Sequence, residues 1–155
     1  DVIFFADSRE SIGLFREVII KPNRFEAAKS CGYKGTEEAL SAEDALRYGA
    51  EVVARNNRPT FVTSGPDGIH VYTETGHTHV PGIFVPSPVD IVGAGDSTTS
   101  GIVSALCAGA NLIEAAVMGN CVASLTIQQL GVTGVATRQQ VLQQFNTNQA
   151  QYSFI

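Results

Sequence analysis

Short apolar runs alternate with helix-capping residues through the first part of the chain, and this order limits the folds open to it. Strands are expected at residues 1–6, 18–20 and 60–63. Capping residues stand between these runs: Ser8, Asn23 and Ser41. Because strands that alternate with helices favour a layered architecture, we predict a three-layer α/β/α domain with a mostly parallel sheet.

The later part of the chain has a different character, with one hairpin followed by helices. Pro66-Asp67-Gly68 is a strong turn signal, and residues 69–73 and 77–85 alternate as hairpin strands do. Three helices are expected after them: residues 96–108, residues 111–131 and a polar helix starting at Thr137. The last two begin with capping-box signatures.

Size and charge narrow the class of protein. The 155 residues are 44% apolar and only 16% charged, so one well-buried domain over residues 1–155 is expected. The net charge of −5 argues against a nucleic-acid partner, since binding a phosphate backbone needs a basic surface. An anion can still bind locally at a helix end.

The cysteines and the lack of a long apolar run indicate a cytoplasmic protein. Cys31, Cys107 and Cys121 show no metal-type spacing, and we expect all three to be buried, reduced thiols. No run of about 18 apolar residues is present, so no membrane span is expected, and no signal peptide is visible.

The start of the chain is unusual. It opens without Met and goes straight into residues 1–6, which have the pattern of a buried strand. Natural domains seldom begin with a core strand. We therefore expect that part of a longer protein is missing upstream.

The run Gly93-Ala94-Gly95-Asp96 places small residues directly before a predicted helix. Small side chains let backbone N–H groups approach a ligand, and the helix adds about half a positive charge at its N-terminus, which together make an anion-binding loop. Asp96 could accept a proton from an incoming hydroxyl, as phosphoryl transfer requires. The alternative is that Asp96 only caps the helix and the glycines only make a tight turn.

Over a longer stretch, the sequence resembles the PfkB/ribokinase family of carbohydrate kinases. That family's signature asks for an Asp-like residue, two variable positions, small-small-Gly-Asp, three free positions and two small residues. The positions that comply are Asp90, Gly93, Ala94, Gly95, Asp96, Ser100 and Gly101. Ile91 departs where Ser, Thr, Val or Pro is usual, and Thr98 stands where Phe is common.

The resemblance extends upstream in the family's order. Lys21-Pro22-Asn23-Arg24-Phe25-Glu26 looks like the family's Lys-Pro-Asn segment running into Asn-x-x-Glu, whose Glu helps to organise Mg²⁺ and phosphate through water. Taken alone, Glu26 would be a solvated helix residue. The stretch Thr63-Ser64-Gly65-Pro66-Asp67-Gly68 resembles the turn that lies along the nucleotide phosphates and ribose, and it is also compatible with a plain hairpin turn.

Two further positions match the adenine side of the family's site. Asn120 matches an Asn that lines the adenine pocket, and Gly131 matches a Gly in the following loop. Asp90 and the carbonyl of Val92 match positions on a monovalent cation, which leaves open whether K⁺ is used. Asn120 by itself could be an ordinary polar helix residue.

His77 and His79 lie two residues apart on a predicted strand, where a metal pair is conceivable. No third ligand with suitable spacing accompanies them in the sequence. An exposed edge strand is the better interpretation.

The resemblance implies a ribokinase-like fold and transfer of the ATP γ-phosphoryl group to a hydroxyl of a sugar, with Asp96 as the base. It covers only the family's C-terminal half, without the substrate motif and the lid. The isolated chain is therefore expected to bind nucleotide without turning over substrate, and activity of the full-length protein is a separate expectation. Family relatives are often homodimers, commonly through the lid, which leaves the oligomeric state open. Alternatives are a non-catalytic nucleotide-binding module and a vitamin or pyrimidine kinase of the same superfamily.

Overall fold

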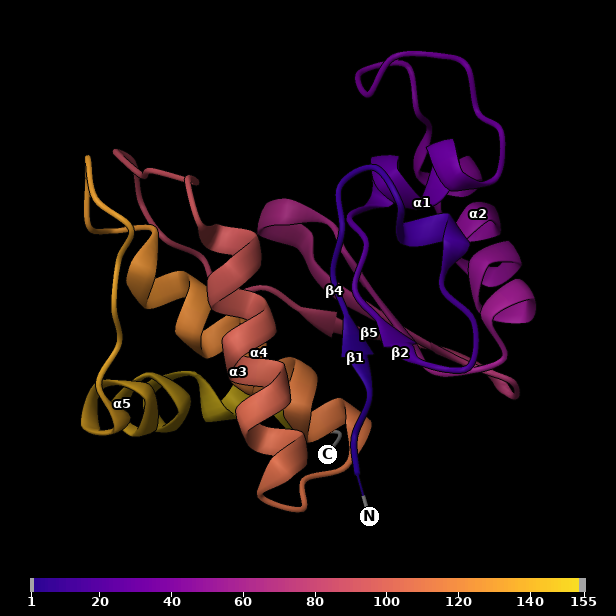
Figure 1. Ribbon diagram of the computed structural model, residues 1–155. Helices are drawn as coiled ribbons and strands as arrows, with labels where there is room; N and C mark the ends of the chain where they lie inside the picture. Colours follow the sequence, from indigo (N-terminus) through magenta and orange to yellow (C-terminus); the bar gives the residue numbers. More distant parts are fainter. Residues whose placement is uncertain (1, 154–155) are drawn as a thin grey trace. The chain divides into compact units, whose positions relative to one another are not determined.

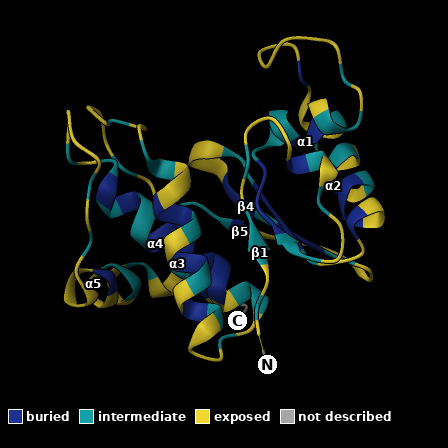
Figure 2. Ribbon diagram, viewed as in Figure 1, coloured by how far each residue is buried: buried dark blue, intermediate teal, exposed yellow. Residues whose placement is uncertain are grey.

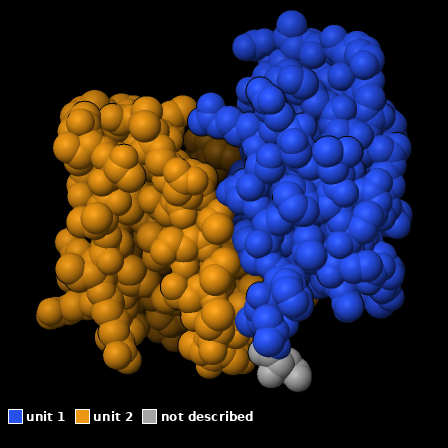
Figure 3. Space-filling view, in the orientation of Figure 1, with its two compact units in different colours: residues 1–64, 70–79 blue, residues 65–69, 80–155 orange. Residues whose placement is uncertain are grey.

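The computed structural model describes residues 2–153 (Figure 1). Contacts within the chain group into two compact units, shown in different colours in Figure 3. Unit 1 comprises residues 1–64 and 70–79, and unit 2 comprises residues 65–69 and 80–155. That the whole chain is a single domain stays a prediction.

The strands form a five-stranded sheet in the order β1-β2-β3-β4-β5. They are β1 (Phe5–Ala6), β2 (Ile19–Ile20), β3 (Thr60–Thr63), β4 (Gly68–Thr73) and β5 (Gly76–Pro81). β1 pairs with β2 and β2 with β3 in parallel, with Phe5 opposite Ile19 and Ile20 opposite Thr60. The short turn between β4 and β5 makes that pair antiparallel.

Two helices in unit 1 cover one face of this sheet: α1 (Arg24–Ser30) and α2 (Ala42–Asn56) (Figure 1). The helices form where predicted because Asn23 and Ser41 cap them with side-chain oxygens. Their apolar faces meet the strands in a cluster of buried residues: Ile12, Ile20, Ala27, Val52, Val53, Val62 and Tyr72. The ribbon in Figure 2 is coloured dark blue wherever residues are buried. Gly49 of α2 lies against the Tyr72 ring, where a Cβ would come within 2.4 Å of it.

Unit 2 is mainly helical, with α3 (Ala94–Cys107), α4 (Leu112–Thr126) and α5 (Arg138–Asn148). α3 and α4 pack closely because glycines face each other at their contact. A Cβ on Gly101 would lie 2.8 Å from the Met118 carbonyl oxygen, and one on Gly119 would lie 3.2 Å from Cγ2 of Thr98. Thr98, which stands where the family pattern has Phe, therefore fits a tight helix contact.

Several boundaries differ from those predicted. The opening strand is only Phe5–Ala6, and Val2 and Phe4 are 78% and 66% exposed, so the expectation of a buried strand is wrong for these two residues. Asp1 lies outside the described residues. β5 ends at Pro81 rather than at residue 85, because proline has no N–H to continue a ladder.

The helical predictions also need two corrections. α4 ends at Thr126 rather than at residue 131, and side-chain amides that follow it take over its last carbonyls. The short helix expected after Ser8 is a single 3₁₀ turn, Ile12–Leu14. The predicted starts at Asn111 and Thr137 are confirmed, each with a complete capping box.

The cysteines are all free, but they are not all buried. Cys121 is buried and Cys31 partly so, whereas Cys107 is exposed at the end of α3, which corrects the expectation for that thiol. Within residues 2–153, no helix has both the length and the apolar character to cross a bilayer.

Replacing Gly101 with Ala tests the α3–α4 contact. The added methyl group meets backbone atoms, so the overpacking cost should exceed the helix-propensity gain and lower the free energy of unfolding by about 1–2 kcal/mol. Urea unfolding measures the change, with Ser104→Ala, an exposed position on the same helix, as the matched control. A Gly101→Ala protein as stable as the parent would show that the helices are less tightly packed.

Thiol labelling tests the cysteine environments. Burial raises the pKa of Cys121 to about 11 and also raises the pKa of Cys31, so both hold little thiolate near neutral pH. We expect Cys107 to react rapidly with a thiol reagent in the folded protein and Cys121 only after denaturation. Mass spectrometry of the labelled peptides identifies each site, and rapid labelling of Cys121 would contradict its burial.

Candidate functional site

The predicted anion-binding loop starts α3. Gly93 adopts a φ of +79°, which favours glycine, and it occupies the N-cap position without a side-chain hydrogen bond. Asp96 is exposed in the first turn, at the third helical position, so it is not the N-cap residue that the alternative interpretation required. The first N–H groups of a helix have no intrahelical acceptors. That of Ala94 donates to the Ile91 carbonyl at 3.1 Å, so the potential anion ligands at the start of α3 are the N–H groups of Gly95 and Asp96.

Asp90 ties this loop to the loop that follows α4. Its Oδ1 accepts a hydrogen bond from the Val92 N–H at 3.0 Å, and its Oδ2 accepts one from the Gly131 N–H at 2.9 Å. The Asp90 N–H in turn donates to the Ile127 carbonyl at 2.8 Å. The two carboxylate bonds lower the pKa of Asp90, so its ionised form is favoured. The structure thus brings Asp90, Val92 and Gly131 together.

In unit 1, Asn23 and Glu26 form a capping box at the start of α1. Asn23 Oδ1 accepts from the Glu26 N–H and Glu26 Oε2 accepts from the Asn23 N–H, both at 2.8 Å. Partial burial raises the pKa of Glu26, while the Asn23 bond and the Lys21 charge act in the opposite direction. Glu26 is therefore a fixed, half-buried carboxylate rather than a freely solvated helix residue.

Lys21 and Asp7 form an ion pair close to this box. Lys21 is 3% exposed, and its Nζ lies 2.9 Å from Asp7 Oδ2. Both residues directly follow strands, Asp7 after β1 and Lys21 after β2. Sequence reasoning gave Asp7 no role, although a carboxylate directly after an apolar strand of an α/β sheet is a recognisable signal.

The end of β3 lies beside the same box. Thr63 pairs in parallel with Asn23, and its N–H donates to the Pro22 carbonyl at 3.0 Å. Ser64 is half-buried, and Gly65 follows with a φ of +57° in the 3₁₀ turn Gly65–Asp67. The carboxyl ends of β1, β2 and β3 thus gather the polar residues of unit 1, as expected where an α/β sheet binds a ligand.

Gly68 and Asn120 both lie against the C-terminal end of β5. A Cβ on Gly68 would lie 2.3 Å from the Val80 carbonyl oxygen. The Asn120 amide donates to the carbonyls of Val80 and Pro81 at 3.3 and 3.0 Å, and Tyr152 donates its hydroxyl to the same Pro81 oxygen at 3.0 Å. Asn120 is 7% exposed, so its amide holds the end of a strand. Its role towards adenine stays a prediction.

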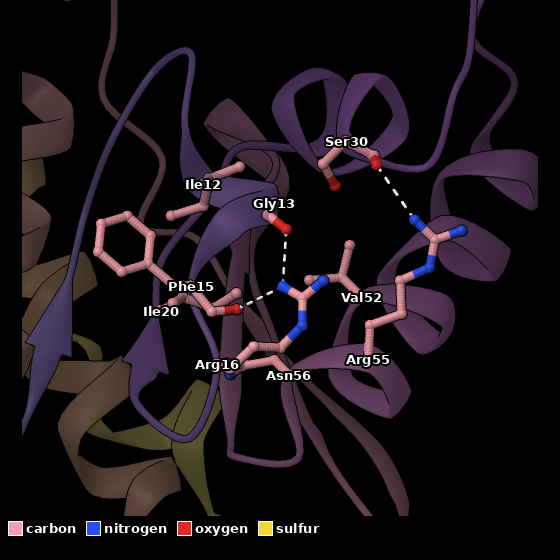
Figure 4. A pocket seen from close by; sticks show the side chains of 9 residues that line it. All are labelled: Ile12, Gly13, Phe15, Arg16, Ile20, Ser30, Val52, Arg55 and Asn56. Atoms are coloured by element: carbon pink, nitrogen blue, oxygen red, sulfur yellow. Dashed lines mark hydrogen bonds between the residues drawn. The ribbon is translucent and has the colours of Figure 1, made fainter.

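A small pocket in unit 1 contains none of the predicted site residues (Figure 4). Arg16 donates to the carbonyls of Gly13 and Phe15, and Arg55 donates to the carbonyl of Ser30. Asn56 Oδ1 is buried without a hydrogen-bond partner among the described residues. Because the guanidinium groups of Arg16 and Arg55 donate to backbone oxygens, they hold the walls of the pocket together. We assign this pocket no part in ligand binding.

The three histidines of the chain stack on the β4–β5 hairpin. The ring centroids of His70 and His79 are 4.5 Å apart, and those of Tyr72 and His77 are 5.1 Å apart. The strand pairing thus places a third imidazole, that of His70, next to His77 and His79. Over residues 2–153, no group of three or more His, Cys, Asp or Glu side chains could hold a metal ion. The rings of His70 and His79 stack face to face.

Comparison with known proteins points to one family. The family profile described as pfkB family carbohydrate kinase matches residues 18–138. The bifunctional protein HldE of Caulobacter vibrioides is 33% identical over 142 residues, covering 88% of this chain and 28% of that protein. Inositol 3-kinase of Zea mays is 36% identical over 92 residues, covering 59% of this chain and 24% of that protein.

Solved structures show the same fold. The ribokinase of Arabidopsis thaliana complexed with ribose and ATP matches with a TM-score of 0.79 and 22% identity, over 92% of this chain and 47% of that one. The ribokinase of Thermotoga maritima matches with a TM-score of 0.78 and 19% identity, over 94% of this chain and 50% of that one. The predicted ribokinase-like α/β fold is confirmed. The chain spans about half the length of these structures and about a quarter of HldE.

Asp90→Asn tests the bridge between the two loops. Asparagine keeps one oxygen acceptor and replaces the other with an NH₂ group, so either the Val92 or the Gly131 N–H loses its acceptor and should exchange on the order of tenfold faster. Since the folded-state pKa of Asp90 is lowered, its stabilisation is present above the unfolded-state value of about 3.9 and is lost as pH falls through the folded-state pKa.

Hydrogen–deuterium exchange by mass spectrometry at neutral pH measures the effect. Glu74→Gln, an exposed carboxylate in the β4–β5 turn, serves as the control. Unchanged exchange at both Val92 and Gly131 in Asp90→Asn would mean that the carboxylate does not hold the two loops.

Proposed function

This chain belongs to the pfkB family of carbohydrate kinases, and we propose that it supplies the nucleotide-binding residues and the base for phosphoryl transfer from ATP to a sugar hydroxyl. The observation that carries this proposal is the start of α3. There an exposed carboxylate, Asp96, shares a helix N-terminus with the small residues Gly93-Ala94-Gly95.

In the proposed reaction, Asp96 accepts the proton of the sugar hydroxyl as the hydroxyl oxygen bonds to the γ-phosphorus. The bond from that phosphorus to the β–γ bridging oxygen breaks, and ADP leaves with the electron pair. The N–H groups at the start of α3 stabilise the charge on the transferred group, because they are oriented before the reaction begins. Asp96 is exposed, so a substrate can reach it.

The residues of unit 1 fit a Mg²⁺–nucleotide. Mg²⁺ prefers oxygen ligands, keeps several waters and commonly uses one or two carboxylates together with substrate phosphates. Glu26 is a carboxylate of this kind, because its capping-box bond fixes its orientation. We assign it to Mg²⁺ through water, with Asn23, Thr63 and Ser64 beside it on the nucleotide. Bound Mg²⁺ would neutralise phosphate charge.

A monovalent cation such as K⁺ is assigned to Asp90 and the Val92 carbonyl. Both lie in the segment that leads into α3, and ionised Asp90 supplies a negative charge there. Phosphoryl transfer by a longer protein that contains this chain is one proposal, and phosphoryl transfer by the isolated chain is another.

Asp96→Asn tests the base. Removing a general base should lower phosphoryl transfer by at least about 100-fold, whereas Mg-ATP affinity should stay within about threefold because the N–H groups are unchanged. Isothermal titration calorimetry measures affinity. A phosphorylation assay over a panel of sugars, with vitamins and pyrimidines included, measures turnover in the longest natural protein that contains the chain. Glu114→Gln is the matched control, because Glu114 holds the third position of α4 as Asp96 does in α3.

The outcomes separate the alternatives. Undiminished turnover in Asp96→Asn would show that another group takes the proton. ATP binding without transfer to any acceptor would favour a non-catalytic nucleotide-binding module. Transfer to a vitamin or pyrimidine, and not to a sugar, would favour the other branch of the superfamily.

A further inference from the structure

The loop between α4 and α5, residues 127–137, carries Gly131, which the family resemblance assigns to the adenine side of the site. The loop has no regular secondary structure of its own beyond a turn at its start, and Leu130, Val132 and Val135 are each more than half exposed. Such a segment would be mobile unless specific bonds held it. Its bonds therefore decide whether Gly131 has a fixed position.

Gln129 supplies an internal brace for this loop. Its Nε2 donates to the Val135 carbonyl at 2.7 Å and to the Leu125 carbonyl at 3.3 Å, and its Oε1 accepts from the Val135 N–H at 3.1 Å. One side chain thus pairs with both backbone groups of Val135 and also with a terminal carbonyl of α4. Only a primary amide of this length offers two donors and an acceptor together.

The brace acts on the part of the loop that faces the anion-binding residues. Residues 130–134 lie between Gln129 and Val135, and they include Gly131, bonded to Asp90, and Thr133, whose Cγ2 would lie 3.2 Å from a Cβ on Gly93. Gly134 closes the turn against Thr126, where a Cβ would come within 2.5 Å of the carbonyl oxygen. The span is therefore fixed by Gln129 and Asp90 from two sides.

Besides its contact with Thr133, the start of α3 has contacts that do not involve this loop. Gly101 and Gly119 bring α3 against α4, and Thr98 Oγ1 donates to the Ala94 carbonyl at 2.8 Å. Loss of the Gln129 brace should consequently leave the phosphate-binding amides in place while it loosens the loop at Gly131.

We propose that Gln129 is a positioning residue for the nucleotide base: it holds residues 130–134 in the conformation that binds adenine and has no part in holding the phosphates. This inference rests on the proposed nucleotide-binding function and adds a residue to it. Gln129 acts through the loop backbone and does not itself contact the nucleotide.

Gln129→Leu and Gln128→Leu form a matched pair for the test. Gln128 also donates to a carbonyl of α4, that of Ser124 at 2.7 Å, but it has no bond to Val135. Calorimetric titration with Mg-ATP and with Mg-tripolyphosphate separates base binding from phosphate binding. Gln129→Leu should weaken Mg-ATP about tenfold and leave tripolyphosphate within about twofold, whereas Gln128→Leu should change neither.

A second variant guards against a simple folding defect. Gln129→Glu keeps the acceptor for the Val135 N–H but loses both donors, so it should also weaken Mg-ATP selectively, and hydrogen exchange should rise at residues 131–134. Equal weakening of ATP and tripolyphosphate, or equal effects of the Gln128 and Gln129 variants, would overturn the inference. If the parent chain binds tripolyphosphate but not ATP, the adenine role fails; if it binds neither, the proposed function fails with it.

Discussion

The close packing of α3 on α4 is the contact on which the candidate site in unit 2 depends. Glycines at the crossing allow the two backbones to approach, with Gly101 beside the carbonyl of Met118. This approach fixes the direction of α3 and hence the direction of the N–H groups at its start. An anion-binding helix terminus is useful only if it does not move when charge develops, because its contribution to catalysis comes from orientation established beforehand.

Hydrogen bonds from side chains to backbone groups supply the rest of the order near these residues. Asp90 and Gln129 connect loop N–H and carbonyl groups that no helix or strand satisfies, and Asn120 does the same at the end of β5. Buried or constrained polar groups that lose such partners are costly, so these bonds hold irregular segments in one conformation. The candidate site in unit 2 therefore consists largely of loops that hydrogen bonds from polar side chains hold in one conformation.

Most of the helices and strands were predictable because their signals are local. Capping boxes at Asn111 and Thr137, and the apolar run at β3, depend on residues within a few positions of one another. The ends of β5 and α4 were misplaced because apolar residues continue past both ends. At α4, side-chain amides that replace backbone donors are visible only in three dimensions.

The same distinction holds for the site. Asp96, Asn23 and Glu26 were predicted as site residues from short motifs, and the structure adds that Glu26 is half-buried and anchored to Asn23. Gln129 left no sequence signal, since its partner Val135 is set by the path of the loop. The third histidine of the hairpin was missed for a similar reason, because only strand pairing brings His70 to His79.

The ion pair between Lys21 and Asp7 constrains how this chain can diverge. Lys21 is almost completely buried, and an ammonium group in that position needs a negative partner because water cannot solvate it. A lineage that lost Asp7 first would leave the buried Lys21 ammonium group without its ion-pair partner. A lineage that lost Lys21 first would leave the carboxylates of Asp7 and Glu26 near each other without the positive charge. Asp7 and Lys21 should therefore covary among descendants of a common ancestor.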